Sequence, residues 1–111
     1  MPLTHDREGS AFIAVPTEKS LDASNVQAFR LSIVPQLEQH DKVVLDLSNV
    51  EFIDSAGVGT LISCLRIVTE RQGQLRLCGL NRAVRALFEL MRMHRLFEVH
   101  PDRRSALSSL A

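Results

Sequence analysis

Hydrophobic and polar residues follow two different periods along this chain, and each change of period marks the boundary of a predicted element. Apolar runs typical of strands occur at residues 11–15, 42–47, 74–79 and 96–99. The Gly9-Ser10 pair before the first run predicts a hairpin with another short strand at residues 3–7. The compact run at 42–47 suits a central strand that is covered on both faces.

Apolar residues at helical spacing fill the segments that follow these strands. The four predicted helices lie at residues 22–37, 57–72, 81–91 and 102–110. The first has Asp22 or Ser24 as its cap and extends, straight or kinked, past Pro35. The second ends before Gly73, and Asn81 caps the third. Because helices of this length between strands require crossover connections, we predict an α/β fold whose small sheet contains parallel pairs.

Length and composition fit one folded unit. The chain has 111 residues, of which 45% are hydrophobic and 23% are charged. A chain of this size buries roughly two thirds of the surface that its unfolded form exposes, which is enough for one core. We therefore predict a single domain over residues 1–111.

The charge distribution disfavours nucleic-acid binding. The 13 basic and 13 acidic side chains cancel, although residues 1–65 (4 basic, 9 acidic) carry −5 and residues 66–111 (9 basic, 4 acidic) carry +5. In the basic half, helical spacing predicts one solvated face rather than a phosphate-binding surface; it comprises Arg82, Arg85, Glu89 and Arg92. The chain has no Trp or Tyr, so it lacks the aromatic platforms on which single strands commonly stack.

Metal, membrane and export signals are weak as well. Cys64 and Cys78 are expected to be buried free thiols, and the four histidines show no metal-ligand spacing, so we predict neither a metal nor a cofactor. Apolar runs are too short to cross a bilayer, and residues 1–10 lack the pattern of a signal peptide. We expect a cytoplasmic protein without membrane insertion.

The stretch EFIDSAGVGT, residues 51–60, raises a specific question. Gly57 and Gly59 fall in the first turns of a predicted helix, where each glycine costs about 1 kcal/mol relative to alanine. The local sequence by itself favours Ser55 as an ordinary N-cap, with Asp54 adding helix-dipole stabilisation. The glycines also remove side chains that would obstruct a docking surface beside Ser55, which would explain the weakened helix start.

Three segments of the chain share their pattern with one known family. In VVLDLSNVEFIDSAGVGTL (43–61) a strand leads through an Asp-Ser step into a glycine-containing helix. LDASN (21–25) matches a loop and a first helix start, and AVRALFELMRMHRLFEV (83–99) matches a third helix and a last strand. Together these segments resemble the STAS domains of bacterial anti-sigma-factor antagonists. The resemblance implies a mixed sheet of four or five strands with helices mainly on one face.

The resemblance also implies a regulatory binding module rather than an enzyme. In this family the antagonist binds an anti-sigma factor that is also a serine kinase of the histidine-kinase-like ATPase fold, and a sigma factor is thereby released. The kinase phosphorylates the serine after the aspartate, here Ser55, and a metal-dependent serine phosphatase removes the phosphate. The implied partner-binding residues are Asp22, Asn25, Asp54, Gly57, Val58 and Thr60.

Some of these positions carry further expectations. Asp22 lies on the partner-facing loop, where we expect a substitution to weaken binding while hardly changing stability. Val58 also belongs to the apolar stripe of its helix, which predicts a core position. Lys19 and Arg92 stand where the family usually has glycine. The sequence leaves the loop shape beside Asp22 open, whereas Arg92 is expected to change the end of the third helix.

Two other functions remain open from the sequence. One is a constitutive docking subunit of the same fold, for instance in a lipid-transport ATPase, in which Ser55 is only structural. The other is an enzyme with Ser55 as nucleophile. IDSAG lacks the glycine before the serine of the hydrolase elbow, and no histidine follows in a pattern that suggests a base, so the sequence disfavours an enzyme.

Overall fold

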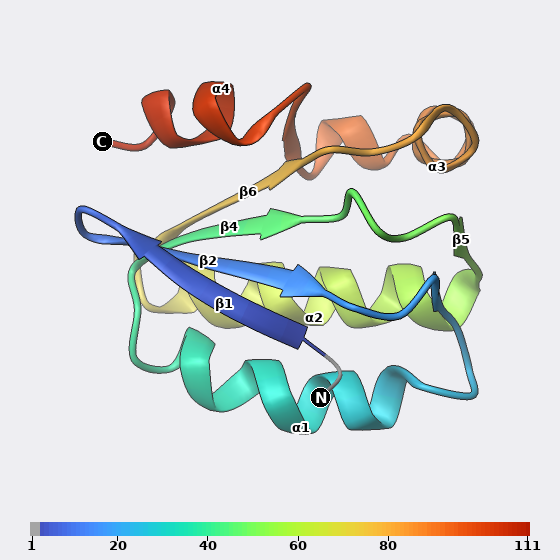
Figure 1. Ribbon diagram of the computed structural model, residues 1–111, viewed down its shortest axis with the longest axis horizontal. Helices are drawn as coiled ribbons and strands as arrows, with labels where there is room; N and C mark the ends of the chain where they lie inside the picture. Colours follow the sequence, from blue (N-terminus) through green and yellow to red (C-terminus); the bar gives the residue numbers. More distant parts are fainter. Residues whose placement is uncertain (1–2) are drawn as a thin grey trace.

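The computed structural model describes residues 3–111 and contains one mixed five-stranded sheet with helices on both faces (Figure 1). The sheet order is β1-β2-β4-β6-β7. These strands are β1 Leu3–Glu8, β2 Ala11–Pro16, β4 Lys42–Asp46, β6 Gln74–Cys78 and β7 Glu98–His100. The hairpin pair β1 and β2 is antiparallel and the other three pairings are parallel, which confirms the predicted small mixed sheet.

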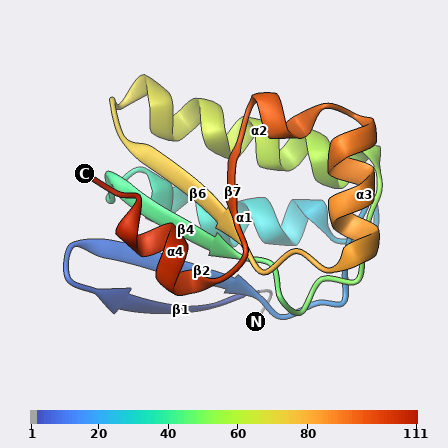
Figure 2. The ribbon, with the colours of Figure 1, turned by 90° about the horizontal axis from the view of Figure 1, so that it is seen from above.

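Helices cover the two faces of the sheet unequally. α1 (Val26–Leu37) and α2 (Ser55–Glu70) lie on one face, whereas α4 (Arg103–Ser108) lies on the other (Figures 1 and 2). α3 (Arg82–Leu90) packs beyond the sheet against β5 (Phe52–Ile53). The buried apolar side chains of α1, α2 and α3 belong to one large cluster, so the helices lie mainly on one side, as predicted.

The central strand β4 is covered on both faces, as its apolar run predicts. Val43 and Leu45 belong to the large cluster under α1 and α2, whereas Val44 belongs to a small cluster with Ala106 of α4. All three strand residues are fully buried. Because successive strand residues point to opposite faces, the continuous run gives β4 one apolar side toward each layer.

Several element boundaries differ from the sequence expectations. α1 begins at Val26, and neither Asp22 nor Ser24 caps it: the N-cap position is Asn25, whose side chain forms no capping hydrogen bond. α1 continues through Pro35 to Leu37. Proline has no N–H to donate within the helix, but Pro35 lies on the exposed side, where water can hydrogen-bond to the carbonyl group left without a donor.

The second predicted helix starts two residues earlier than expected and the last strand starts two residues later. α2 runs from Ser55 to Glu70, so the glycines lie inside it rather than at its boundary. The last strand begins at Glu98 because a 3₁₀ turn, Met93–Arg95, precedes it and holds Leu96 and Phe97 outside the sheet.

A second, two-stranded sheet was absent from the sequence expectations. β3 (Ser20–Leu21) pairs in parallel with β5, with Ser20 opposite Phe52 and Leu21 opposite Ile53. Two-residue strands are too short to give a period-2 signal. This pairing brings the loop after β2 beside the residues that lead into α2, and it therefore builds the site described below.

Buried polar and sulfur groups stabilise the layers without offering reactive chemistry. Cys64 and Cys78 are buried free thiols, as predicted, and burial raises the pKa of each to about 12. Asp46 at the end of β4 accepts a hydrogen bond from Arg103 Nη2 at 2.9 Å, which ties α4 to the sheet.

Among residues 3–111, no helix has both the length and the apolar character that a bilayer span requires.

Arg92 ends α3 in the way that a glycine would. Its φ of 58° and ψ of 30° lie in the left-handed region, directly after the last turn of the helix. Helices commonly end with a residue in this conformation, and glycine adopts it without a steric penalty. The expected change in the helix end is therefore wrong, since arginine takes up the backbone that glycine favours.

We expect Arg92→Gly to raise the free energy of unfolding by about 1 kcal/mol. The left-handed conformation costs an L-residue about 1–2 kcal/mol, part of which the greater freedom of glycine in the unfolded chain offsets. Urea unfolding of both proteins measures the difference. The control is Arg95→Gly, which places glycine at a position without positive φ and should lower stability. An unchanged or lower urea midpoint for Arg92→Gly would contradict the strain argument.

Candidate functional site

Asp54, rather than Ser55, caps helix α2. Asp54 has extended backbone angles (φ −103°, ψ −173°), and its Oδ1 accepts a hydrogen bond from the Gly57 N–H at 2.9 Å. The interpretation of Ser55 as an ordinary N-cap is therefore wrong. Because aspartate already satisfies a donor of the first turn, the serine that follows it has no capping task.

Ser55 is the first residue of α2 and is exposed. Its hydroxyl forms no hydrogen bond with any group of residues 3–111. By contrast, the Thr60 hydroxyl donates to the Ala56 carbonyl at 3.0 Å and the Ser63 hydroxyl donates to the Gly59 carbonyl at 3.1 Å. At the start of α2, Ser55 thus presents the hydroxyl that is free for chemistry.

Gly57 and Gly59 occur in α2 for different structural reasons. A Cβ on Gly57 would lie 2.2 Å from the carbonyl oxygen of Leu21, so only glycine lets β3 approach the helix this closely. Accessibility of Ser55 does not explain Gly57, which corrects the sequence expectation. Gly59 is exposed, and a Cβ there would meet nothing within 4 Å. Four residues after Ser55, it lies on the same side of the helix and leaves that surface flat.

Asp54 also joins the helix start to the neighbouring loop. Its Oδ2 accepts a hydrogen bond from the Ala23 N–H at 3.2 Å, and its own N–H donates to the Leu21 carbonyl at 3.2 Å. One carboxylate thereby holds both the first turn of α2 and the loop that follows β3. Ser55 and the loop surface around Ala23 are consequently kept in a defined relation.

Asp22 and Asn25 shape this loop from inside. The Asp22 carboxylate accepts hydrogen bonds from the Ser24 hydroxyl, the Ser20 hydroxyl at 2.8 Å and the Ser24 N–H at 2.9 Å. These bonds, that of the Ser24 hydroxyl first, hold the pKa of Asp22 below its ordinary value. Asn25 accepts from the Asp22 N–H at 3.0 Å and donates to the Ser20 carbonyl at 2.7 Å. Both side chains therefore form their hydrogen bonds within the loop itself.

We therefore expect Asp22→Ala to lower the melting temperature, which revises the expectation of an almost unchanged stability. The substitution removes the acceptor of three hydrogen bonds that order residues 20–24. Because the folded pKa of Asp22 is depressed, this stabilisation is present above pH 3.8 and is lost as the pH falls through the lower folded pKa. The difference in melting temperature between parent and variant should accordingly disappear in acid.

Thermal melts of parent and variant between pH 2 and pH 7 measure this effect. The control is Glu18→Ala on the same loop, where the exposed side chain should change stability by less than about 0.5 kcal/mol at any pH. A variant that melts with the parent at pH 7 would show that the loop does not depend on the Asp22 carboxylate.

Lys19 fits its position without strain. Its carbonyl accepts hydrogen bonds from the Glu51 N–H at 2.6 Å and the Phe52 N–H at 3.3 Å, next to the β3–β5 pair. Within residues 3–111 the non-glycine residues with positive φ are Gln72 and Arg92. The backbone at Lys19 thus requires no glycine, which answers the question that the sequence left open for this loop.

The predicted partner-binding residues differ in what they expose. Gly57, Val58 and Thr60 are buried, so in this conformation their side chains support the surface from below; this agrees with the core position expected for Val58. Asp22, Asn25 and Asp54 are half-buried and engaged within the site. Gly57, Val58 and Thr60 are therefore too buried in this conformation to contact a partner directly.

Phe52 is a surface feature that sequence reasoning missed. Its side chain is 56% exposed, three residues before Ser55, and it borders a groove between β5 and α3 that Ala83 and Leu87 also line. The signal in the sequence was an aromatic residue flanked by Glu51 and Ile53 outside any longer strand pattern. An exposed aromatic ring is the kind of side chain that anchors protein interfaces.

These features belong to a known family. The model of the STAS domain family matches residues 5–106, and the chain is therefore a member of that family. An anti-sigma F factor antagonist from Paenibacillus polymyxa is 22% identical to it, over 97% of this chain and 92% of the relative. An anti-sigma-B factor antagonist from Staphylococcus epidermidis is 27% identical, over 88% of each chain.

Solved structures agree with the fold. An anti-sigma-factor antagonist (STAS) domain protein from Planctomyces limnophilus superposes with a TM-score of 0.87 at 18% identity, covering 96% of each chain. The Bacillus cell fate determinant SpoIIAA in its phosphorylated form superposes with a TM-score of 0.70 at 16% identity, again over 96% of each chain. At these identities the likeness concerns the arrangement of strands and helices.

Proposed function

We propose that this chain is an anti-sigma-factor antagonist, a binding module whose affinity for its partner is switched by phosphorylation of Ser55. The observation that carries the proposal is the exposed, unbonded hydroxyl of Ser55 at the first position of α2, while Asp54 does the capping. Membership of the STAS family supports it, as do the relatives named as antagonists and the similarity to a protein solved in a phosphorylated form.

The proposed partner is an anti-sigma factor that is also a serine kinase of the histidine-kinase-like ATPase fold. By holding this partner, the unmodified antagonist releases a sigma factor in the cytoplasm. A metal-dependent serine phosphatase restores the unmodified state. The antagonist itself acts by binding rather than catalysis, which fits a Ser55 hydroxyl that no histidine of residues 3–111 hydrogen-bonds as a base.

Phosphorylation of Ser55 would change the surface without unfolding the helix. The phosphate adds a charge of about −1.5 to −2 at the end of α2 where the helix dipole favours an anion. The first turn therefore tolerates the group. In a packed interface the same group would be desolvated close to the carboxylates of Asp54 and Asp22, which repel it.

The surface that would meet the partner is small, and the half-buried carboxylates of Asp22 and Asp54 lie within it. It comprises exposed residues of the loop and the helix start, Ala23, Ser24, Ser55 and Gly59, together with the ring of Phe52. The small side chains around the Ser55 hydroxyl suit close packing of a kinase active site. The exposed ring of Phe52, three residues earlier in the chain, provides an apolar anchor.

The decisive experiment is phosphorylation by the cognate kinase followed by intact-mass analysis. We expect one added phosphate on the parent and none on Ser55→Ala, because the hydroxyls of Thr60 and Ser63 are bonded to helix carbonyls. Thr60→Ala is the control and should take up one phosphate. Phosphate on Ser55→Ala would refute a single switch residue.

The same assay separates the proposal from a constitutive docking subunit. An antagonist binds the kinase in a pull-down and loses that binding after incubation with ATP. A docking subunit of another complex takes up no phosphate, and its partner binding is indifferent to ATP. Binding that persists through complete phosphorylation of Ser55 would contradict the switch even if the site itself is correct.

A further inference from the structure

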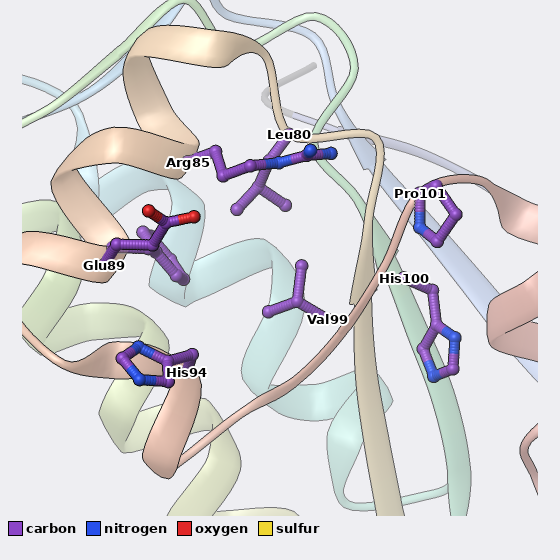
Figure 3. Close-up of a pocket in the computed structure, with 8 residues that line it drawn as sticks. Leu80, Arg85, Glu89, His94, Val99, His100 and Pro101 are labelled. Carbon is purple, nitrogen blue, oxygen red and sulfur yellow. The ribbon is translucent and has the colours of Figure 1, made fainter.

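A pocket on the opposite side of α3 from Phe52 has no part in the proposed switch. It lies between α3 and β7, has a volume of about 370 Å³, and includes Leu80, which follows β6, and Val99 of β7 in its wall (Figure 3). This size is near the lower end for small-molecule sites. The carboxyl ends of parallel strands, where this pocket opens, are the usual place for ligands in α/β sheets.

Arg85 crosses the mouth of this pocket without an internal partner. Figure 3 shows its side chain extending from α3 over Leu80. The guanidinium of Arg85 forms no ion pair or hydrogen bond within residues 3–111, whereas Arg71 and Arg103 are each paired with an aspartate. A guanidinium over an apolar floor, with all its donors free, matches the carboxylate of a ligand.

Glu89, one turn after Arg85, gives the pocket a second polar group. Its carboxylate points toward the space under Arg85 and is likewise unpaired within residues 3–111 (Figure 3). This negative charge repels polyanions such as nucleoside triphosphates and accepts a hydrogen bond from an ammonium or hydroxyl. His94 stands on the same side of the pocket as a third polar group.

His100 also lines the pocket, but its ring points away from Arg85 and Glu89. Figure 3 places its ring on the other side of β7 from Val99. Its Nε2 lies 3.1 Å from Glu98 Oε2, so that ring is engaged with the strand's own surface. The floor under Arg85 and Glu89 is instead apolar and is formed by Leu80, Phe88 and Val99.

We infer that this pocket binds a free α-amino acid with an apolar side chain. Arg85 takes the carboxylate, Glu89 takes the ammonium group, and the apolar floor takes the side chain. α3 separates this pocket from the groove at Phe52, since Ala83 and Leu87 of the same helix line that groove. The inference does not depend on phosphorylation of Ser55 and is tested separately from it.

The test is a titration of the ¹⁵N-labelled chain with three ligands that share one carbon skeleton, and binding is monitored by the amide chemical shifts. L-Leucine carries both charged groups, 4-methylpentanoate lacks the ammonium, and L-leucinamide lacks the carboxylate. We expect leucine to shift the amides around Leu80, Phe88 and Val99, and each truncated ligand to bind about tenfold more weakly, the loss typical of one charged hydrogen bond. Equal affinity for leucine and leucinamide would overturn the assignment of Arg85.

Two variants and one control localise the binding. Arg85→Gln and Glu89→Gln should each weaken leucine binding about tenfold, and Glu89→Gln should bring leucine and 4-methylpentanoate closer together in affinity. Arg82→Gln removes a charge from an exposed position of the same helix and should change the affinity less than twofold. The inference fails if leucine at 20 mM shifts no pocket amide, if Arg82→Gln weakens binding as much as Arg85→Gln, or if inorganic phosphate competes with leucine.

Discussion

Ser55→Asp should lower the affinity for the anti-sigma partner by about a thousandfold and leave the chain folded. A thousandfold corresponds to about 4 kcal/mol, the scale of an unpaired charge desolvated in an interface. The fold should hold because the new carboxylate stands in the first turn of α2, where the helix dipole favours it by roughly 0.3–1 kcal/mol. No cap is lost, since Asp54 rather than Ser55 accepts the hydrogen bond of the Gly57 N–H.

Ser55→Ala is the matched variant, because it removes the hydroxyl and adds no charge. The Ser55 hydroxyl forms no hydrogen bond within residues 3–111, so its loss should change neither the fold nor the unmodified surface. We expect this variant to bind as tightly as the parent and to keep binding when the kinase and ATP are present. Parent and alanine variant should diverge only after phosphorylation.

Calorimetric titration of the partner with both variants, together with thermal melts, measures these effects. If the aspartate variant binds as tightly as the alanine variant while folded, charge at position 55 does not exclude the partner. The phosphorylated parent is then the required comparison, since a single carboxylate carries less charge than a phosphate. Tight binding by the fully phosphorylated chain as well would refute electrostatic switching.

Long elements of this fold could be predicted because burial leaves a period in the sequence. β4 is apolar at consecutive positions since α4 covers Val44 and the other helices cover Val43 and Leu45. β3 and β5 could not be predicted in this way, because two residues show no period and their pairing joins segments about 30 positions apart. The resemblance to STAS domains supplied the location of the site, whereas the periodicity supplied only the layers around it.

Individual side-chain roles were harder to predict than positions. Asp54 and Ser55 are both good capping residues, and composition does not decide between them; the backbone does, by making Asp54 extended and Ser55 helical. Asp22 looked like a free surface carboxylate, but the hydroxyls of Ser20 and Ser24 occupy it. Short polar side chains compete for nearby donors, and which competitor wins depends on loop geometry that a sequence does not display.

Gly57→Ala should lower the free energy of unfolding by about 3 kcal/mol, the largest stability loss we expect from a single methyl group in this chain. The added Cβ would meet the Leu21 carbonyl oxygen at 2.2 Å and the Ile53 side chain at 2.9 Å. The first contact is with backbone, so no rotamer change relieves it, and α2 and β3 must move apart. At about 4 °C per kcal/mol for a chain of this size, the melting temperature should fall by about 10 °C or more.

Gly59→Ala is the matched control and should have the opposite sign. Its Cβ meets nothing within 4 Å, and alanine in place of glycine inside a helix contributes about 1 kcal/mol, so the variant should melt about 4 °C higher than the parent. It should also weaken partner binding, because the methyl group stands one turn from Ser55 on the same side of α2. Higher stability with undiminished binding would show that the flat surface at Gly59 does not contact the partner. A Gly57→Ala variant as stable as the parent would show that β3 can move away from α2 without loss of stability.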